Sequence, residues 1–268
     1  MRAAHARVLR QALLSAMLLA CAAVAAAQTP EATATPAAAP AFDRPGIGFG
    51  TATLAPGTFA WEQGVPDFQR TSDSGADSTL YSATTLLRAG LTRTLELQLG
   101  SAIANRLQER AAGHTTTVHG RGDMTLALKM TLPSPSAQLS WAALGAVNFA
   151  DGSRAFAATR TGYDLGVTLS YELSDAWSGG FYINASRADG TSTVDVSPSL
   201  NFAIAKSLGA FVEVGANYGS HGLNDAVLGG GFTLMVTRAV QLDLSADVGL
   251  TSNSPKLQGG FGVCVYFQ

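Results

Sequence analysis

The sequence predicts an all-β fold, a single antiparallel transmembrane β-barrel of about twelve strands. Three observations support this prediction. Apolar and polar residues alternate along many segments of about 11 residues, close to the length of a tilted strand that crosses a bilayer. Short and long connections between these segments alternate along the chain. The ionisable residues of the segments gather on one strand face, so the other face can meet lipid.

The composition excludes several classes of protein. Of the 268 residues 47% are hydrophobic and only 13% are charged, which is too apolar for a disordered chain. The formal net charge of −2, without a basic stripe, argues against nucleic acid as a partner. His114, His119 and His221 form no cluster at metal-ligand spacing, so we expect neither a metal site nor a cofactor.

Residues 1–27 have the features of a secretory signal peptide. Three arginines precede the apolar stretch "ALLSAMLLACAAVAAA" (12–27), and Ala25 and Ala27 form an A-x-A cleavage site before Gln28. The stretch "LLAC" (18–21) also resembles a lipobox, so lipidation of Cys21 stays open beside cleavage with the signal. We therefore expect export to the outer membrane of a Gram-negative bacterium.

Residues 28–57 are expected to be a flexible lead-in, and residues 58–268 the barrel. "QTPEATATPAAAPAF" (28–42) is rich in Pro, Ala and Thr and has no periodicity. "GIGFG" (46–50) is similar to a dinucleotide-binding loop, but it opens no helix of a βαβ unit. We interpret it as a flexible entry to the first strand.

The expected strands follow in chain order and share the alternating pattern, which is clearest in "VQLDLSADVGL" (240–250). Pro66 and Pro198 interrupt the first and the eighth, because proline cannot donate to the ladder. The expected ranges are 58–69, 79–91, 94–104, 122–132, 138–149, 162–173, 177–187, 193–205, 209–219, 226–237, 240–250 and 257–267.

The connections differ in length at the two ends of the expected strands. Gaps of a few residues, such as "TR" (92–93) and "SDA" (174–176), alternate with longer ones, of which "NRLQERAAGHTTTVHGR" (105–121) is the longest. Membrane barrels have short periplasmic turns and longer outside loops, whereas a soluble sandwich has no reason for such a segregation. We expect segment 105–121 to be an extracellular loop.

The strand faces predict which residues line the interior. The sequence neighbours of Lys129 are apolar, and their side chains point to the opposite face of the strand. A lysine facing lipid at the midplane would cost roughly 2–4 kcal/mol, so Lys129 is expected to face the interior. The residues expected to face the lumen are Glu62, Arg88, Glu96, Asp123, Lys129, Asp164, Glu172, Asp195, Glu213, Asp243 and Asp247. Glu213 and Asp243 are expected at similar depth. The excess of carboxylates fits either a closed, internally paired lumen or a conduit that prefers cations.

Several stretches resemble a known family. They are "DRPGIGFGTATLAPGTFAWEQG" (43–64), "TLLRAGLTRTLELQLG" (85–100), "GRGDMTLALKM" (120–130) and "GGGFTLMVTRAVQLDLSADVGL" (229–250). They resemble the outer-membrane transporter family of the meta-pathway of phenol degradation. The resemblance implies uptake of small aromatic compounds and supplies no binding residues. The chain departs from the pattern at "GGG" (229–231), where an acid is expected, and at Gln268, which follows the near-terminal Phe267.

The functional prediction is an outer-membrane channel or transporter for small molecules, aromatic compounds among them. The expected partners are outer-membrane lipid, a small-molecule solute and, through the C-terminal strand, the barrel-assembly machinery. One alternative is a non-transporting structural or interaction barrel with a closed lumen. A lipid-modifying barrel enzyme is a further alternative, but no catalytic residue is assigned, because no His lies in an expected strand.

Overall fold

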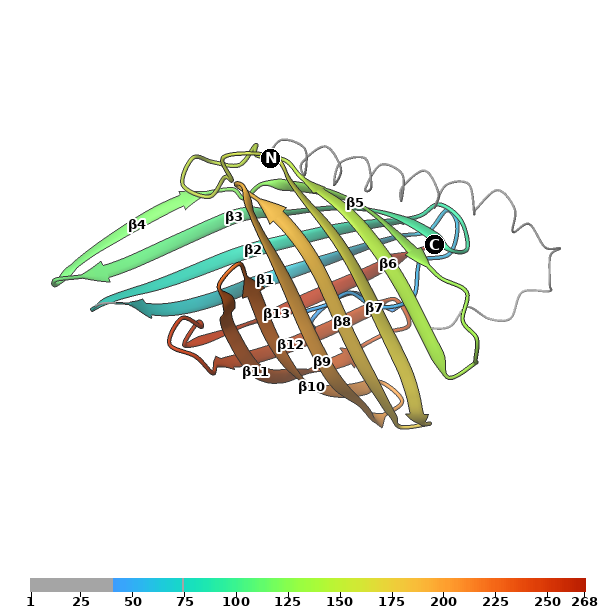
Figure 1. Ribbon diagram of the computed structural model, residues 1–268. Coiled ribbons are helices and arrows are strands. Elements are labelled where there is room, and N and C mark those ends of the chain that lie inside the picture. Colours follow the sequence, from blue (N-terminus) through green and yellow to red (C-terminus); the bar gives the residue numbers. More distant parts are fainter. Residues whose placement is uncertain (1–40, 74) are drawn as a thin grey trace. The chain divides into compact units, whose positions relative to one another are not determined.

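The computed structural model describes residues 41–73 and 75–268, so the expected signal peptide and residues 28–40 of the lead-in lie outside the described residues. The described part contains thirteen strands and no α-helix (Figure 1). Within that part, no helix is long and apolar enough to span a membrane. The strands are β1 (Phe59–Asp73), β2 (Ala76–Gly90), β3 (Leu95–Ala111), β4 (His114–Gly120), β5 (Met124–Thr131), β6 (Leu139–Asn148), β7 (Gly162–Ser174), β8 (Trp177–Ala188), β9 (Thr191–Ala205), β10 (Leu208–Gly219), β11 (Gly222–Met235), β12 (Val240–Gly249) and β13 (Leu257–Phe267).

The strands form one closed antiparallel barrel. Strands that follow one another in the chain pair with each other, except β4 and β5, and β1 pairs with β13 from Phe59 opposite Phe267 onward, which closes the ring. The first part of β3 pairs with β5 and its last part with β4. The wall therefore has twelve strands, as the sequence predicts, and β4 is a thirteenth strand attached to β3 alone.

The prediction of a loop at residues 105–121 is wrong, because most of these residues form a β-hairpin. β3 continues to Ala111, turns through Ala112 and Gly113 with φ of 48° and 80°, and returns as β4. Positive φ at both central residues is the geometry of a tight hairpin turn. Apart from Leu107 opposite Val118, the hairpin pairs polar or small residues across the two strands, so it has no continuous apolar face and no alternation for the sequence to reveal. His114 and His119 consequently lie in a strand rather than in a loop.

Other expected long loops are also strand extensions. β8 and β9 continue to a turn at Asp189 and Gly190, and β1 and β2 continue to positions 73 and 76. Residues 149–161 and 250–256 remain as long connections at this end of the barrel. We call it the far end, and the opposite end, where β1 begins and β13 ends, the short-turn end.

Burial in the barrel wall is the reverse of that in a soluble protein. In β12, Asp243 is 2% exposed, whereas Leu244 is 54% exposed. Large apolar side chains along the other strands are exposed in the same way. Because an exposed apolar band would be costly in water, this outer face fits contact with lipid.

The three glycines 229–231 have a packing reason. A Cβ at Gly229 would lie 2.1 Å from the Asp247 carboxylate, and a Cβ at Gly230 would lie 2.1 Å from the Phe211 carbonyl. Side chains and backbone of neighbouring strands thus lie over the β11 backbone. An acid at this point would collide with them, which explains the departure from the expected pattern.

Candidate functional site in the barrel interior

Residues 41–54, here called the inserted segment, lie inside the barrel. The segment contacts residues on strands from around the whole ring, which only a segment within a closed barrel can do. These residues include Glu62 of β1, Arg88 of β2, Glu96 of β3, Lys129 of β5, Ser140 of β6, Tyr182 of β8, Glu213 of β10 and Asp243 of β12. The sequence pattern indicated only a flexible lead-in here.

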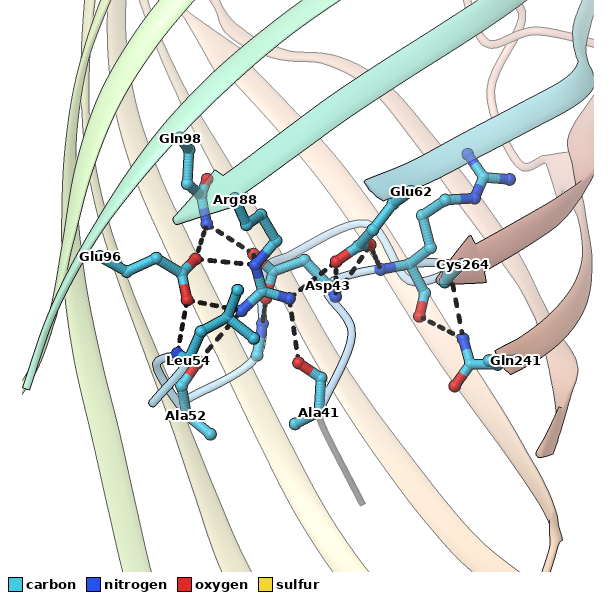
Figure 2. A network of polar contacts seen from close by, with 12 residues as sticks. Ala41, Asp43, Ala52, Leu54, Glu62, Arg88, Glu96, Gln98, Gln241 and Cys264 are labelled. Atoms are coloured by element: carbon cyan, nitrogen blue, oxygen red, sulfur yellow. Dashed lines mark hydrogen bonds and ion pairs between the residues drawn. The ribbon is translucent and has the colours of Figure 1, made fainter. Parts of the chain in front are cut away.

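Arg88 is the centre of a buried charged cluster (Figure 2). Its guanidinium donates to Glu62 Oε1 at 2.7 Å and to both oxygens of Glu96, at 2.7 and 3.0 Å. It also donates to the carbonyl of Ala41 at 2.9 Å, so it binds the backbone of the inserted segment. The side chains of Arg88, Glu62 and Glu96 are fully buried. Such charges are stable only when they are paired and hydrogen-bonded, as these are.

Asp43 links the inserted segment to this cluster. Its carboxylate accepts from Lys129 Nζ at 2.6 Å, from Gln98 Nε2 at 2.8 Å and from the amide of Gly50 at 2.9 Å. Arg88 Nε lies 3.6 Å away. The amide of Asp43 in turn donates to Glu62. One side chain therefore neutralises Lys129 and also closes the turn of the segment.

Arg44 anchors the segment to β1 and β12. Its guanidinium donates to both oxygens of Asp67, at 2.9 and 3.2 Å, and to Asp243 at 3.2 Å. Asp67 follows an irregularity in β1, where residues 65–66 leave the ladder with both neighbouring strands. A Cβ at Gly262 would lie 2.4 Å from Arg44 Nε, so glycine there makes room for the arginine.

The "GIGFG" stretch packs in the middle of the barrel. The amide of Ile47 donates to Glu213 at 3.0 Å. The ring of Phe49 meets Tyr182 edge-to-face with a centroid distance of 5.6 Å, and Lys129 Nζ lies 5.6 Å from the same ring centroid. A Cβ at Gly166 would lie 2.9 Å from Phe49, so a glycine in β7 accommodates the ring. The motif serves packing rather than phosphate binding.

Of the residues expected to face the lumen, six contact the inserted segment: Glu62, Arg88, Glu96, Lys129, Glu213 and Asp243. Three others are bonded to polar residues of neighbouring strands. Asp164 accepts from Asn148 and Asn184, Asp195 from Asn217, and Asp247 from Gln258. Glu172 is exposed and borders the larger interior cavity described below.

The register gives Glu213 a different acidic neighbour from the expected one. Glu213 is opposite Gly229, and Gly229 is opposite Asp247, so the acid in register with Glu213 across the sheet is Asp247 rather than Asp243. Strands of a barrel are staggered, and counting from the turns does not include this stagger. Arg44 pairs with Asp243, whereas neither Glu213 nor Asp247 has an ion-pair partner among the described residues.

Asp123 does not lie in a strand. It precedes β5, and its carboxylate accepts from the amides of Asp151, Gly152 and Ala158, so it holds the loop 149–161. Asp151 and Asp189 bind the same region at the barrel surface. The Met124 amide lowers the pKa of Asp151, and the Thr159 hydroxyl and amide lower the pKa of Asp189.

Two cavities lie in the barrel interior, and the larger one borders the inserted segment. The larger, of about 640 Å³, is bordered by residues 41–46 and 48–52 and by side chains of β7 to β11. Ser, Thr and Asn groups alternate there with Phe49, Tyr182 and Phe211. The smaller, of about 240 Å³, is bordered by Gln98, Thr125, Asp164, Asn184 and neighbouring residues.

The sequence reasoning missed Asp43, Arg44, Phe49 and Tyr182. The first three lie in the tract interpreted as a lead-in, and Tyr182 was interpreted only as part of a strand. One signal was available: adjacent opposite charges, Asp43 and Arg44, follow a tract of Pro, Ala and Thr that contains a single charge, Glu31. Such a pair directly before a lumen with buried ions of both signs can neutralise them.

Residues 42–267 match a family described as "Putative MetA-pathway of phenol degradation". The chain belongs to this family. The match begins at Phe42, so the inserted segment is part of the family domain and the barrel strands are not its only elements. None of the curated proteins compared with the chain matches it significantly.

Similar solved structures are outer-membrane barrels. The crystal structure of the COG4313 outer membrane channel from Pseudomonas putida F1 is 16% identical, covers 83% of this chain and 98% of that chain, and gives a TM-score of 0.58. The NanC porin is 10% identical over 78% of this chain and 99% of that chain, with a TM-score of 0.49. The CymD monoaromatic hydrocarbon channel is 10% identical over 80% and 89%, with a TM-score of 0.42. The first comparison shows a shared fold, and the protein is an outer-membrane β-barrel.

Proposed function

We propose that the barrel is a channel or transporter for small molecules and that small aromatic compounds are its substrate class. The observation that supports this most directly is the cavity of about 640 Å³ within the wall. Sites for small ligands commonly have about 300–1,000 Å³ and combine apolar walls with a few polar groups. The cavity has this character, since Phe49, Tyr182 and Phe211 lie among hydroxyl and amide groups.

The aromatic preference rests on the lining and on the family. Ring faces and edges attract another ring in offset or edge-to-face arrangements, and hydroxyl or amide groups can bond a phenolic hydroxyl. The family description refers to phenol degradation. The solved relative from Pseudomonas putida F1 is named an outer membrane channel, which agrees with a conducting barrel.

Conductance in planar bilayers tests the proposal. The purified protein, checked for a folded barrel by heat-modifiable mobility in gels, should give discrete current steps. Phenol should block the current in a concentration-dependent way, and cyclohexanol, which has similar size but no aromatic ring, should block it less. Equal block of the current by both compounds would contradict the proposed preference for aromatic compounds.

The closed-barrel alternative has its own support. The charged cluster is paired and buried, as expected for a lumen that side chains close. Absence of both conductance and phenol binding in the folded protein would favour that alternative. The enzyme alternative gains no support: the described histidines, His114, His119 and His221, are all exposed and none lies in the twelve-stranded wall.

We also propose two macromolecular contacts. The exposed apolar side chains of the wall would face outer-membrane lipid. β13, which closes the barrel against β1 and ends at Phe267, would be the segment that the barrel-assembly machinery recognises. Removal of residues 267–268 should slow membrane assembly of newly made chains, with little change in the conductance of those that assemble.

A further inference from the structure

Tyr182 is the one described residue that borders both interior cavities. The larger cavity is also bordered by the turn residues 174–176, so it extends to the short-turn end. The smaller cavity is bordered by Asn184, two residues farther along β8, and by Asp164 and Thr125, which lie near the far-end termini of β7 and β5. The two cavities therefore follow one another along the barrel, and Tyr182 stands between them.

The inserted segment meets Tyr182 at this point. A Cβ at Gly48 would lie 2.7 Å from Tyr182 Cγ, so the backbone of the segment packs directly against the ring. Phe49 adds the edge-to-face contact, and Gly166 of β7 receives the Phe49 ring from the other side. The backbone of the segment and Phe49 therefore pack against the one described residue that borders both cavities.

The inserted segment and the Tyr182 side chain differ in how firmly each is held in place. The segment is held by the ion pairs of Asp43 and Arg44, and breaking such buried pairs is costly. Tyr182 is only partly buried and has two side-chain torsions, with open space of the two cavities on either side of it. A rotation of one side chain is therefore the easier way to join the cavities.

We propose that Tyr182 is the gate of the barrel, the side chain whose displacement joins the two cavities, and that its ring sets the size limit for solutes. The inference rests on the proposed channel function. The hydroxyl has no role in it: the ring closes the passage by its volume, packed against Gly48 and Phe49.

The test compares Tyr182→Ala with Ile183→Ala. Ile183 is the next residue of β8, faces outward and is 40% exposed, so it controls for a truncated side chain at the same height of the same strand. Tyr182→Ala should raise single-channel conductance roughly threefold or more, because the narrowest section governs conduction, and should admit larger sugars in liposome swelling. Ile183→Ala should conduct like the parent, and Tyr182→Phe, which keeps the ring, should conduct less than Tyr182→Ala.

Tyr182→Cys supplies a second measurement. It should conduct like Tyr182→Ala, close again on reaction with a bulky methanethiosulfonate, and reopen with reductant; Cys264 is fully buried and should not react in the parent. A parent that conducts while both small variants at position 182 conduct equally would refute the gate and leave the channel function intact. Current in Tyr182→Ala but none in the parent would support the gate. Absence of current in all folded variants would refute the channel function itself, and the gate with it.

Discussion

Replacement of Asp43 by Asn should release the inserted segment from the barrel interior. Among the described residues, Asp43 is the one carboxylate paired with the fully buried Lys129, and it also lies 3.6 Å from Arg88. Glu62 and Glu96 still neutralise Arg88 after the change, but Lys129 loses its partner. Removing one partner of a buried pair costs about 3–5 kcal/mol. At about 1.4 kcal/mol per factor of ten, the equilibrium between inserted and released segment shifts by roughly two to three and a half orders of magnitude.

The closed ring of strands does not depend on this pair, so the barrel should remain folded. Single-channel conductance should rise, and a cysteine placed at Ile47 should react faster with a water-soluble maleimide in the Asp43→Asn background. Glu172→Gln is the matched control, because it removes an exposed carboxylate at the same cavity that has no contact with the segment. Adding Lys129→Met to Asp43→Asn should restore slow labelling, since no unpaired charge then remains. Unchanged conductance and labelling in Asp43→Asn would refute the anchoring role of the cluster.

The remaining predictions concern the interior acids, the lipid face and the far-end loop. Replacing Glu213 by Gln together with Asp247 by Asn should shift the reversal potential in a salt gradient toward anions, because the two acids are in register two strands apart, have no ion-pair partner among the described residues and add their fields within a Debye length of roughly 8–10 Å. Asp151→Asn should not shift it. Cysteines at Leu242 and Leu244 should react poorly with maleimide in intact membranes, and a cysteine at Ser245 should react faster. The opposite order would show that the apolar face of β12 does not meet lipid. The Thr159 hydroxyl and amide lower the pKa of Asp189, so its stabilising contribution is present above the unfolded value of about 4 and is lost as the pH falls through the lower folded value. Hydrogen exchange in residues 149–161, corrected for intrinsic rate, should thus stay unchanged from pH 7 to 5 and increase only below about pH 4, whereas Asp189→Asn should increase it at pH 7.

The wall of the barrel was predictable because each membrane strand meets two different environments. In β12, Asp243 and Leu244 are neighbours in sequence and opposite in surroundings, and lipid enforces this contrast along the whole strand. Where the strands leave the membrane, the contrast ends. Thr116 of β4 and Glu109 of β3 are paired in water, and neither face of that hairpin needs apolar residues. Periodicity therefore identifies the membrane part of each strand and misses the extension beyond it.

The interior was harder to predict, because the alternation along a strand shows which charged residues face the lumen but not which residues they pair with. The sequence places Glu62, Arg88, Glu96 and Lys129 on one face, but the partner of Lys129 is Asp43, which lies in no strand. Counting residues from the turns likewise does not give depth. The stagger of the strands brings Glu213 into register with Asp247, with only the side-chain-free Gly229 between them.

The anchoring of the inserted segment and the position of Tyr182 have one physical origin. A barrel of this size must fill its interior, and a polar interior is best filled by groups that satisfy its charges. The inserted segment does this on the side of β1 to β5, where Asp43 completes the pairing of Arg88 and Lys129. On the side of β7 to β11 the larger cavity is bordered by Ser, Thr and Asn together with the acids Glu172 and Glu213, and no Lys or Arg of these strands is among the described residues that border it. The ion pairs of the segment thus lie with β12, β1, β2 and β5, and the larger cavity, which Tyr182 borders, lies beside strands that form no ion pair with the segment among the described residues.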